Sequence, residues 1–140
     1  GKSCTTYNCT GVGTPMFSTV ACLSYLNVPV IADGQIREVG DVCKALVAGA
    51  DMVMIGSEFA KCFDSPAKRV MKKKEFYGSA SSTNKGHDGY VEGKIVYLEM
   101  RQESYKEYLE RINQGIQSCM SYAGTDDIKK LHLMEYSVYK

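Results

Sequence analysis

Residues 28–57, with the sequence VPVIADGQIREVGDVCKALVAGADMVMIGS, contain two short apolar runs separated by a helical pattern. The runs cover residues 28–32 and 52–55, and a turn containing glycine follows each of them. Continuous apolar runs of this length are typical of parallel strands that are buried on both faces. Between them, residues 37–48 carry apolar side chains at helical spacing, and Gly49 suits the end of that helix. We therefore predict a strand, a helix and a second strand of a parallel α/β fold.

Further elements are predicted on both sides of this unit. They are a helix over 16–26, a short helix over 58–62, a strand over 95–98, a long helix from the capping box of Ser104 and Glu107 to about 122, and a short helix from 127 before an extended piece over 135–138. The long helix should turn one apolar face inward, formed by Tyr105, Leu109, Ile112, Ile116, Cys119 and Met120. Residues 76–94 are small, polar and rich in glycine, which predicts a ligand-binding or covering loop.

Composition excludes several classes of protein. The 140 residues include 17 basic and 16 acidic ones, and a net charge of +1 gives no electrostatic footprint for nucleic acid or a membrane surface. No apolar segment approaches the roughly 20 residues of a membrane span, and no signal peptide is recognised. Residues 72–74 are three lysines, which we interpret as a solvated surface.

Cysteine usage indicates free thiols in a reducing cytosol. The six cysteines lie singly, without a CxxC pair, and Cys22, Cys43 and Cys119 fall in apolar helical patterns where a thiol packs well. The two histidines are far apart in the sequence, so we expect no metal site built from side chains.

The first residues carry a candidate nucleophile. Cys4 lies among hydroxyl side chains and precedes a glycine-rich stretch, so it belongs to a loop and not to an apolar face. A packed free thiol and a reactive thiol both remain open on spacing alone.

Two strand ends carry candidate binding residues. In parallel sheets ligands gather at the carboxyl ends of the strands, where Asp33 could accept hydrogen bonds from ribose hydroxyls. Gly56 and Ser57, at the end of the next strand, could present backbone N–H groups to an anion. Gly-Ser also ends many strands that bind nothing, and a loop carboxylate such as Glu92 is most often solvated.

In chain order, these motifs resemble the IMP dehydrogenase/GMP reductase family. The resemblance is carried by residues 1–6 (GKSCTT), 10–13 (TGVG), 31–34 (IADG), 40–41 (GD), 49–57 (GADMVMIGS), 77–81 (YGSAS), 91–94 (VEGK) and 121–124 (SYAG). It implies the C-terminal part of a TIM (β/α)8 barrel with a flap loop. Residues 1–140 would be a portion of that single domain, with the catalytic cysteine loop at 1–15 and the flap at about 76–100.

The resemblance also implies roles for individual residues. Cys4 would add to C2 of the purine, and Thr6 and Glu92 would help ammonia to leave. The substrate-binding residues would be Lys2, Asp33, Gly34, Gln35, Gly56, Ser57, Ser79 and Ala80, with the ribose at Asp33 and the phosphate at the glycine loops. A monovalent cation such as K+ would bind at backbone carbonyls near Gly1 and Cys4.

The reaction so implied is reductive deamination of GMP to IMP and ammonia with NADPH, through a covalent thioimidate on Cys4. It would serve purine nucleotide salvage in the cytoplasm, in a homotetramer. IMP dehydrogenase, which converts IMP to XMP with NAD, is the near alternative. Its flap carries an Arg-Tyr pair, and residues 81–91 contain no arginine, so the reductase is favoured. A non-catalytic fragment or association module is the third interpretation.

Two features set this chain apart from the family pattern. Gln35 stands where the family has a second glycine, and Tyr7 stands where a basic residue is usual. A complete barrel also takes about 250 residues, so the first half would be absent. We therefore expect the isolated chain to be poorly folded and inactive.

Overall fold

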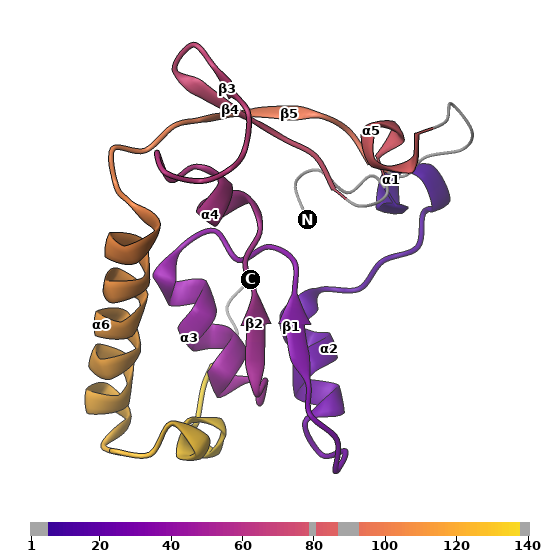
Figure 1. The fold of residues 1–140 in the computed structure, drawn as a ribbon. Helices are drawn as coiled ribbons and strands as arrows, with labels where there is room; N and C mark the ends of the chain where they lie inside the picture. Colours follow the sequence, from indigo (N-terminus) through magenta and orange to yellow (C-terminus); the bar gives the residue numbers. More distant parts are fainter. Residues whose placement is uncertain (1–5, 79–80, 87–92, 138–140) are drawn as a thin grey trace. The chain divides into compact units, whose positions relative to one another are not determined.

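The computed structural model describes residues 6–78, 81–86 and 93–137 (Figure 1). The chain forms two compact units. The first unit contains Gly1–Thr14 and Ile55–Leu109, and the second contains Pro15–Met54 and Glu110–Lys140. The long helix α6 (Tyr105–Ala123) begins in the first unit and continues in the second.

The second unit contains the predicted strand–helix–strand arrangement. Its elements are α2 (Met16–Leu23), β1 (Ile31–Asp33), α3 (Val39–Val47), β2 (Met52–Met54), most of α6, and the 3-10 helix η1 (Ile128–Leu133). Strands β1 and β2 pair in parallel, with Ile31 opposite Met52. The parallel α/β architecture is therefore confirmed for this unit, as a two-stranded open sheet.

The prediction that both faces of these strands are buried is wrong. Ala32 is 1% exposed, whereas Ile31, Met52 and Met54 are 48%, 56% and 53% exposed. Successive side chains of a strand point to opposite faces, and α2 and α3 contact β1 and β2 respectively. One face of this small sheet is therefore covered by helices, and the other is apolar and open. The strand also begins later than expected, because the Val30 N–H bonds to the Asp51 carboxylate at 2.8 Å.

Helix α3 begins with a capping box. The Arg37 and Glu38 N–H groups each donate to Asp41 Oδ2 at 3.1 Å. Burial raises the pKa of Asp41, but these backbone hydrogen bonds and the nearby Lys44 outweigh it, so the pKa lies below its usual value. At the other end Gly49 has φ +102°, and a Cβ there would lie 2.4 Å from Ser24 Cβ. Only glycine fits this turn.

The first unit has an antiparallel sheet that the sequence did not predict. The order is β3 (Arg69–Val70), β4 (Lys73–Phe76) and β5 (Val96–Glu99). Within it Lys74 is 4% exposed, and its Nζ donates to the Ser65 and Ala67 carbonyls at 2.9 and 3.3 Å. The interpretation of residues 72–74 as a solvated surface is therefore wrong for Lys74, because backbone carbonyls replace water around its ammonium.

The described part of the predicted loop over 76–94 contains regular secondary structure. Phe76 is the last residue of β4, and a one-turn helix, α5 (Ser82–Lys85), lies within residues 76–94. Strand β5 falls within one residue of the predicted strand. The other short helices of this unit are α1 (Thr6–Thr10) and α4 (Ser57–Ala60).

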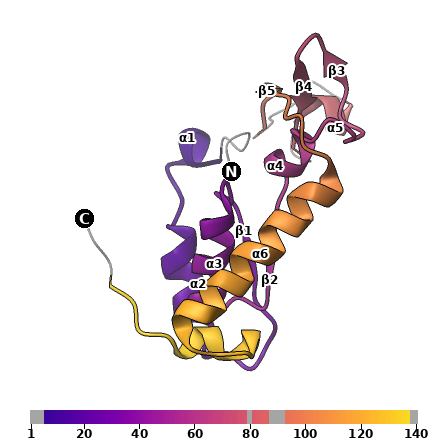
Figure 2. The same ribbon diagram turned by 90° about the vertical axis from the view of Figure 1, so that its left-hand side faces the viewer.

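The long predicted helix is confirmed as α6, which Figure 2 shows from the side. Ser104 and Glu107 form the predicted cap, with Ser104 N and Oγ both donating to Glu107 Oε2 at 2.7 Å. These bonds hold the pKa of Glu107 below its usual value. The predicted inward face is wrong at its start: Tyr105 and Leu109 are exposed, and Tyr108 is buried instead.

No helix in the described part of the chain is both long and apolar enough to cross a lipid bilayer.

Candidate functional site

The predicted catalytic loop is described only from Thr6 onward. Thr6 is the first residue of α1, and its carbonyl accepts a hydrogen bond from Thr10 Oγ1 at 2.7 Å. The other predicted catalytic residues, and part of the substrate set, lie outside the described residues: Lys2, Cys4, Ser79, Ala80 and Glu92. The carbonyls predicted to hold a monovalent cation, near Gly1 and Cys4, lie outside them as well.

The predicted ribose and phosphate residues of the second unit lie together at the end of β1. Asp33 is the last residue of the strand and is exposed to solvent. Gly34 and Gln35 then form a turn with φ of +103° and +63°. A positive φ suits Gly34, whereas it costs a residue with a Cβ about 1 kcal/mol or more. Gln35 is therefore strained at the position where the resemblance expected a second glycine.

The predicted phosphate residues of the first unit lie at the start of α4. Gly56 precedes the helix and Ser57 is its first residue. The Ala60 and Lys61 N–H groups donate to the Gly56 and Ser57 carbonyls at 3.1 and 3.2 Å. A Cβ on Gly56 would lie 3.3 Å from Phe76 Cζ, so the aromatic ring closely approaches this backbone. The structure thus confirms that a short helix begins directly after Gly56.

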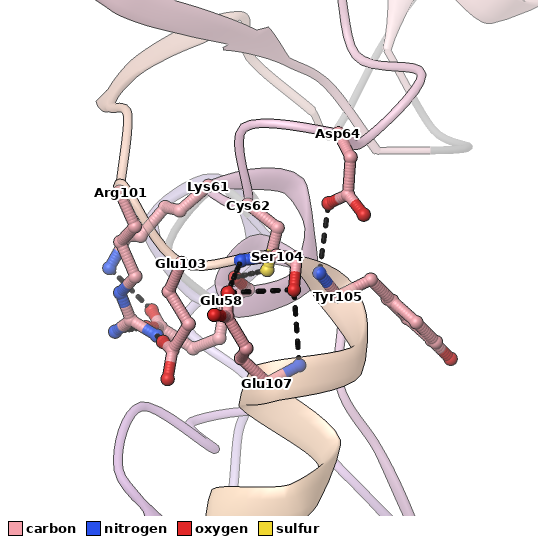
Figure 3. A network of polar contacts seen from close by, with 9 residues as sticks. All are labelled: Glu58, Lys61, Cys62, Asp64, Arg101, Glu103, Ser104, Tyr105 and Glu107. Atoms are coloured by element: carbon pink, nitrogen blue, oxygen red, sulfur yellow. Dashed lines mark hydrogen bonds and ion pairs between the residues drawn. The ribbon is translucent and has the colours of Figure 1, made fainter.

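A buried charge follows these residues directly. Glu58 is 2% exposed, and its carboxylate accepts from Lys61 Nζ at 2.6 Å and from Arg101 Nη2 (Figure 3). The Arg101 guanidinium also lies 4.9 Å from the centre of the Tyr108 ring. We call Glu58, Lys61 and Arg101 the Glu58 cluster.

The sequence analysis missed the Glu58 cluster. Glu58 and Lys61 are three residues apart, a spacing that allows an ion pair on a helix. The third member, Arg101, comes from a segment 43 residues away, after β5, and no local pattern links the two. Only the Glu–Lys spacing could have signalled this contact.

A cavity of about 610 Å³ lies in the first unit beside the far end of α4. Phe59, Phe76 and Tyr105 are among the side chains that line it. None of the described residues predicted to bind substrate lines this cavity.

Among residues 6–78, 81–86 and 93–137, no three side chains of histidine, cysteine, aspartate or glutamate are grouped as metal ligands would be. The described residues also place the predicted substrate groups in separate units. Asp33, Gly34 and Gln35 belong to the second unit, and Gly56 and Ser57 to the first.

Comparison with known proteins identifies the family. The family model for the IMP dehydrogenase / GMP reductase domain matches residues 1–138. The GMP reductase of Streptococcus pyogenes serotype M1 is 42% identical over 147 residues, covering 100% of this chain and 45% of the relative. The GMP reductase of Chromobacterium violaceum is 43% identical over 141 residues, covering 96% of this chain and 44% of the relative.

A GMP reductase of Staphylococcus epidermidis is 40% identical over 147 residues and is likewise covered to 45%. The chain therefore spans a little under half the length of these curated relatives. The predicted position in the C-terminal half of the barrel is not confirmed by these matches. A match over nearly every residue shows that the chain belongs to the IMP dehydrogenase/GMP reductase family.

Proposed function

We propose that this chain is part of a GMP reductase, which converts GMP to IMP and ammonia. One observation carries the proposal: relatives named GMP reductase match 96–100% of the chain at 40–43% identity. The absence of arginine from residues 81–91 also favours the reductase over IMP dehydrogenase, whose flap carries an Arg-Tyr pair.

The chemistry assigned to the chain begins with the thiol of Cys4. Its thiolate adds to C2 of the purine, and the bond from C2 to the amino group breaks as that group takes a proton and leaves as ammonia. Thr6 and Glu92 relay the proton, because a carboxylate hydrogen-bonded to a hydroxyl can transfer one. The remaining thioimidate is then reduced at C2, and the carbon–sulfur bond breaks to return the Cys4 thiolate.

The cofactor in this proposal is NADPH, which supplies the hydride that ends on C2. Its binding residues are expected largely in the part of the protein outside this chain. The chain itself holds the substrate: Asp33 accepts hydrogen bonds from the ribose, and Ser79 and Ala80 hold the base through their backbone.

The substrate phosphate is assigned to the glycine turns. Gly34, Gln35, Gly56 and Ser57 offer backbone N–H groups, and Lys2 adds a positive charge. The φ of +63° at Gln35 supports this assignment, since the turn keeps a glycine-like conformation without a glycine. The bent backbone is what an N–H cradle for an anion needs.

The same proposal places these elements in a (β/α)8 barrel completed by further residues of the protein. The open face of the β1–β2 sheet supports it, because Ile31, Met52 and Met54 are about half exposed there. Apolar side chains on a parallel sheet are normally buried, and further strands would cover this face. A homotetramer acting in cytoplasmic purine salvage, with a bound monovalent cation, completes the proposal.

The direct test is oxidation of NADPH by the full-length protein in the presence of GMP. We expect oxidation that depends on GMP and that the substitution Cys4→Ala abolishes. Reduction of NAD with IMP, in place of that activity, would show IMP dehydrogenase instead. A folded protein that is silent in both assays would favour a non-catalytic role.

A further inference from the structure

The helix that begins at the proposed phosphate residues Gly56 and Ser57 is too short to be stable without tertiary contacts. α4 contains four residues, Ser57–Ala60, and a single turn is not stable by its own hydrogen bonds. Contacts with the rest of the first unit must therefore set its position. The same contacts set the direction of the Gly56 and Ser57 N–H groups, since these residues form the start of the helix.

Glu58 supplies contacts of this kind from inside the helix. It is almost fully buried, and both of its carboxylate oxygens are used, Oε1 by Lys61 and Oε2 by Arg101 (Figure 3). The Arg101 N–H also donates to the Lys61 carbonyl at 2.8 Å. Residue 101 is thus joined to Glu58 of α4 by a side-chain contact and to Lys61, the C-cap residue of α4, by a backbone contact. Together these contacts restrict both the position and the orientation of the helix.

Aromatic contacts restrict the same turn. Gly56 lies against the Phe76 ring, where even a Cβ would be 3.3 Å from Cζ. Phe59, also on α4, packs edge-on against Tyr108 with ring centres 5.4 Å apart. The Arg101 guanidinium contacts that same Tyr108 ring. The ion pairs of Glu58 are therefore part of a packed arrangement and not a solvated surface pair.

We propose that Glu58 is a positioning residue for the substrate phosphate. Through Lys61 and Arg101 it holds α4 so that the Gly56 and Ser57 backbone keeps the geometry that binds the anion. This inference rests on the proposed function for the identity of the ligand, a purine nucleoside monophosphate. It adds a residue that does not touch the substrate and acts only through the helix that does.

The sign of the charge separates positioning from a direct electrostatic effect. Glu58 is an anion, and an anion near a phosphate disfavours binding through space. Glu58→Gln removes this charge and leaves Lys61 and Arg101 in place. A through-space effect would therefore tighten binding of the nucleotide, whereas loss of positioning would weaken it.

The test measures dissociation constants for GMP and guanosine by calorimetry, with the full-length protein and its variants. We expect Glu58→Gln to raise the dissociation constant for GMP about tenfold, since small displacements of binding groups have effects of this size or larger. Guanosine lacks the phosphate, so its dissociation constant should be unchanged. An unchanged or tighter binding of GMP, or an equal loss for both ligands, would overturn the proposal.

Glu103→Gln is the matched control. It removes the same charge from a side chain that is 23% exposed and lies 3.8 Å from Arg101 Nη1, farther from its cation than the Glu58 carboxylate is from Lys61 Nζ. We expect it to leave the GMP dissociation constant unchanged. A loss of GMP binding equal to that of Glu58→Gln would show that the affinity does not depend on the particular contacts of Glu58, and would contradict the proposal.

A second variant serves if Glu58→Gln does not fold. The pair Glu58→Met with Arg101→Met replaces the ion pair of the buried Glu58 carboxylate by two apolar side chains, and such exchanges of buried ion pairs are often neutral or stabilising. Methionine is flexible and does not fix an orientation, so we expect the same selective loss of GMP binding. Binding of GMP equal to that of the native protein would overturn the proposal.

Failure of this inference is distinct from failure of the proposed function. A native protein that binds GMP without oxidising NADPH would refute the reductase but leave the binding test intact. A native protein that reduces GMP, with a Glu58→Gln variant that binds it normally, would refute the positioning role alone.

Discussion

In each of the two units, one helix is held against another segment of the chain, but the contacts differ in kind. In the first unit, the Glu58 cluster joins α4 to the segment before α6 through ion pairs to the buried Glu58 carboxylate. In the second unit, α3 and α6 meet at Gly115, where a Cβ would lie 2.1 Å from Val39 Cγ1. The charged contact fixes orientation, whereas the glycine contact allows close approach. The charged contact adjoins the proposed phosphate site, which is where orientation matters.

The largest effect on stability is expected from breaking the charged contact on one side only. Glu58→Ala should lower the free energy of unfolding of the full-length protein by about 2–4 kcal/mol, because it leaves Arg101 and Lys61 without their buried partner. Both cations are about a quarter exposed, at 28% and 26%, which places the loss toward the lower end of that range. Denaturant unfolding measures it. If Glu58→Ala lowered the free energy of unfolding no more than Glu103→Ala does, the burial of the Glu58 carboxylate would not contribute to stability as we expect.

A smaller effect is expected from filling the close contact in the second unit. Gly115→Ala should destabilise by about 1–2 kcal/mol, since overpacking costs more than the gain in helix propensity returns. The double variant Gly115→Ala with Val39→Ala should recover part of this loss, because it removes the methyl group that clashes. Equal stability of the single and double variants would show that α3 and α6 can separate at no cost.

Gln35 offers a substitution in the opposite direction. Gln35→Gly should stabilise the protein by about 1 kcal/mol or less, because glycine adopts φ +63° without strain but loses more entropy on folding. Thermal unfolding measures the difference. Gln35→Ala is the matched control and should not stabilise, because alanine keeps the Cβ. If both variants stabilised the protein equally, backbone strain at Gln35 would not be the cause.

The smallest effect concerns a thiol in the contact between α3 and α6. Cys43 Sγ lies 3.6 Å from the Gly115 carbonyl oxygen, and burial together with the neighbouring Cys119 raises the pKa of Cys43 from 9.0 to about 11. The neutral thiol is therefore favoured by folding, and this contribution is complete below pH 9 and is lost as the pH rises toward 11. The native protein should lose stability over this window more than Cys43→Ser does. If the stability of the two proteins depended on pH in the same way between pH 9 and 11, the raised pKa of Cys43 would be contradicted.

The sequence predicted the elements that depend on local patterns. The parallel pairing of β1 and β2 follows from two apolar runs around a helix, and the caps of α3 and α6 follow from Gly49, Ser104 and Glu107. In the candidate site, the same patterns placed Asp33 at a strand end and Gly56 before a short helix.

The features that the sequence did not reveal depend on contacts between distant segments. Lys74 looks like any surface lysine until the carbonyls of residues 65 and 67 surround it. Arg101 reaches Glu58 across 43 residues, and Tyr108 is buried beneath it in place of Tyr105. Cys22 was predicted to pack as a buried thiol and is exposed, whereas Cys62 is fully buried. Helical spacing defines a face, but tertiary contacts decide which part of that face is covered.

Trapping the covalent bond that we propose between Cys4 and C2 of the purine would show whether Cys4 is the nucleophile. The full-length protein would be mixed with GMP, quenched rapidly in acid and digested for mass spectrometry. We expect a peptide containing Cys4 whose mass is increased by that of GMP less ammonia, and no such increase in peptides containing the other cysteines. GMP-dependent NADPH oxidation by a Cys4→Ala variant, with no modified peptide in the native protein, would contradict it.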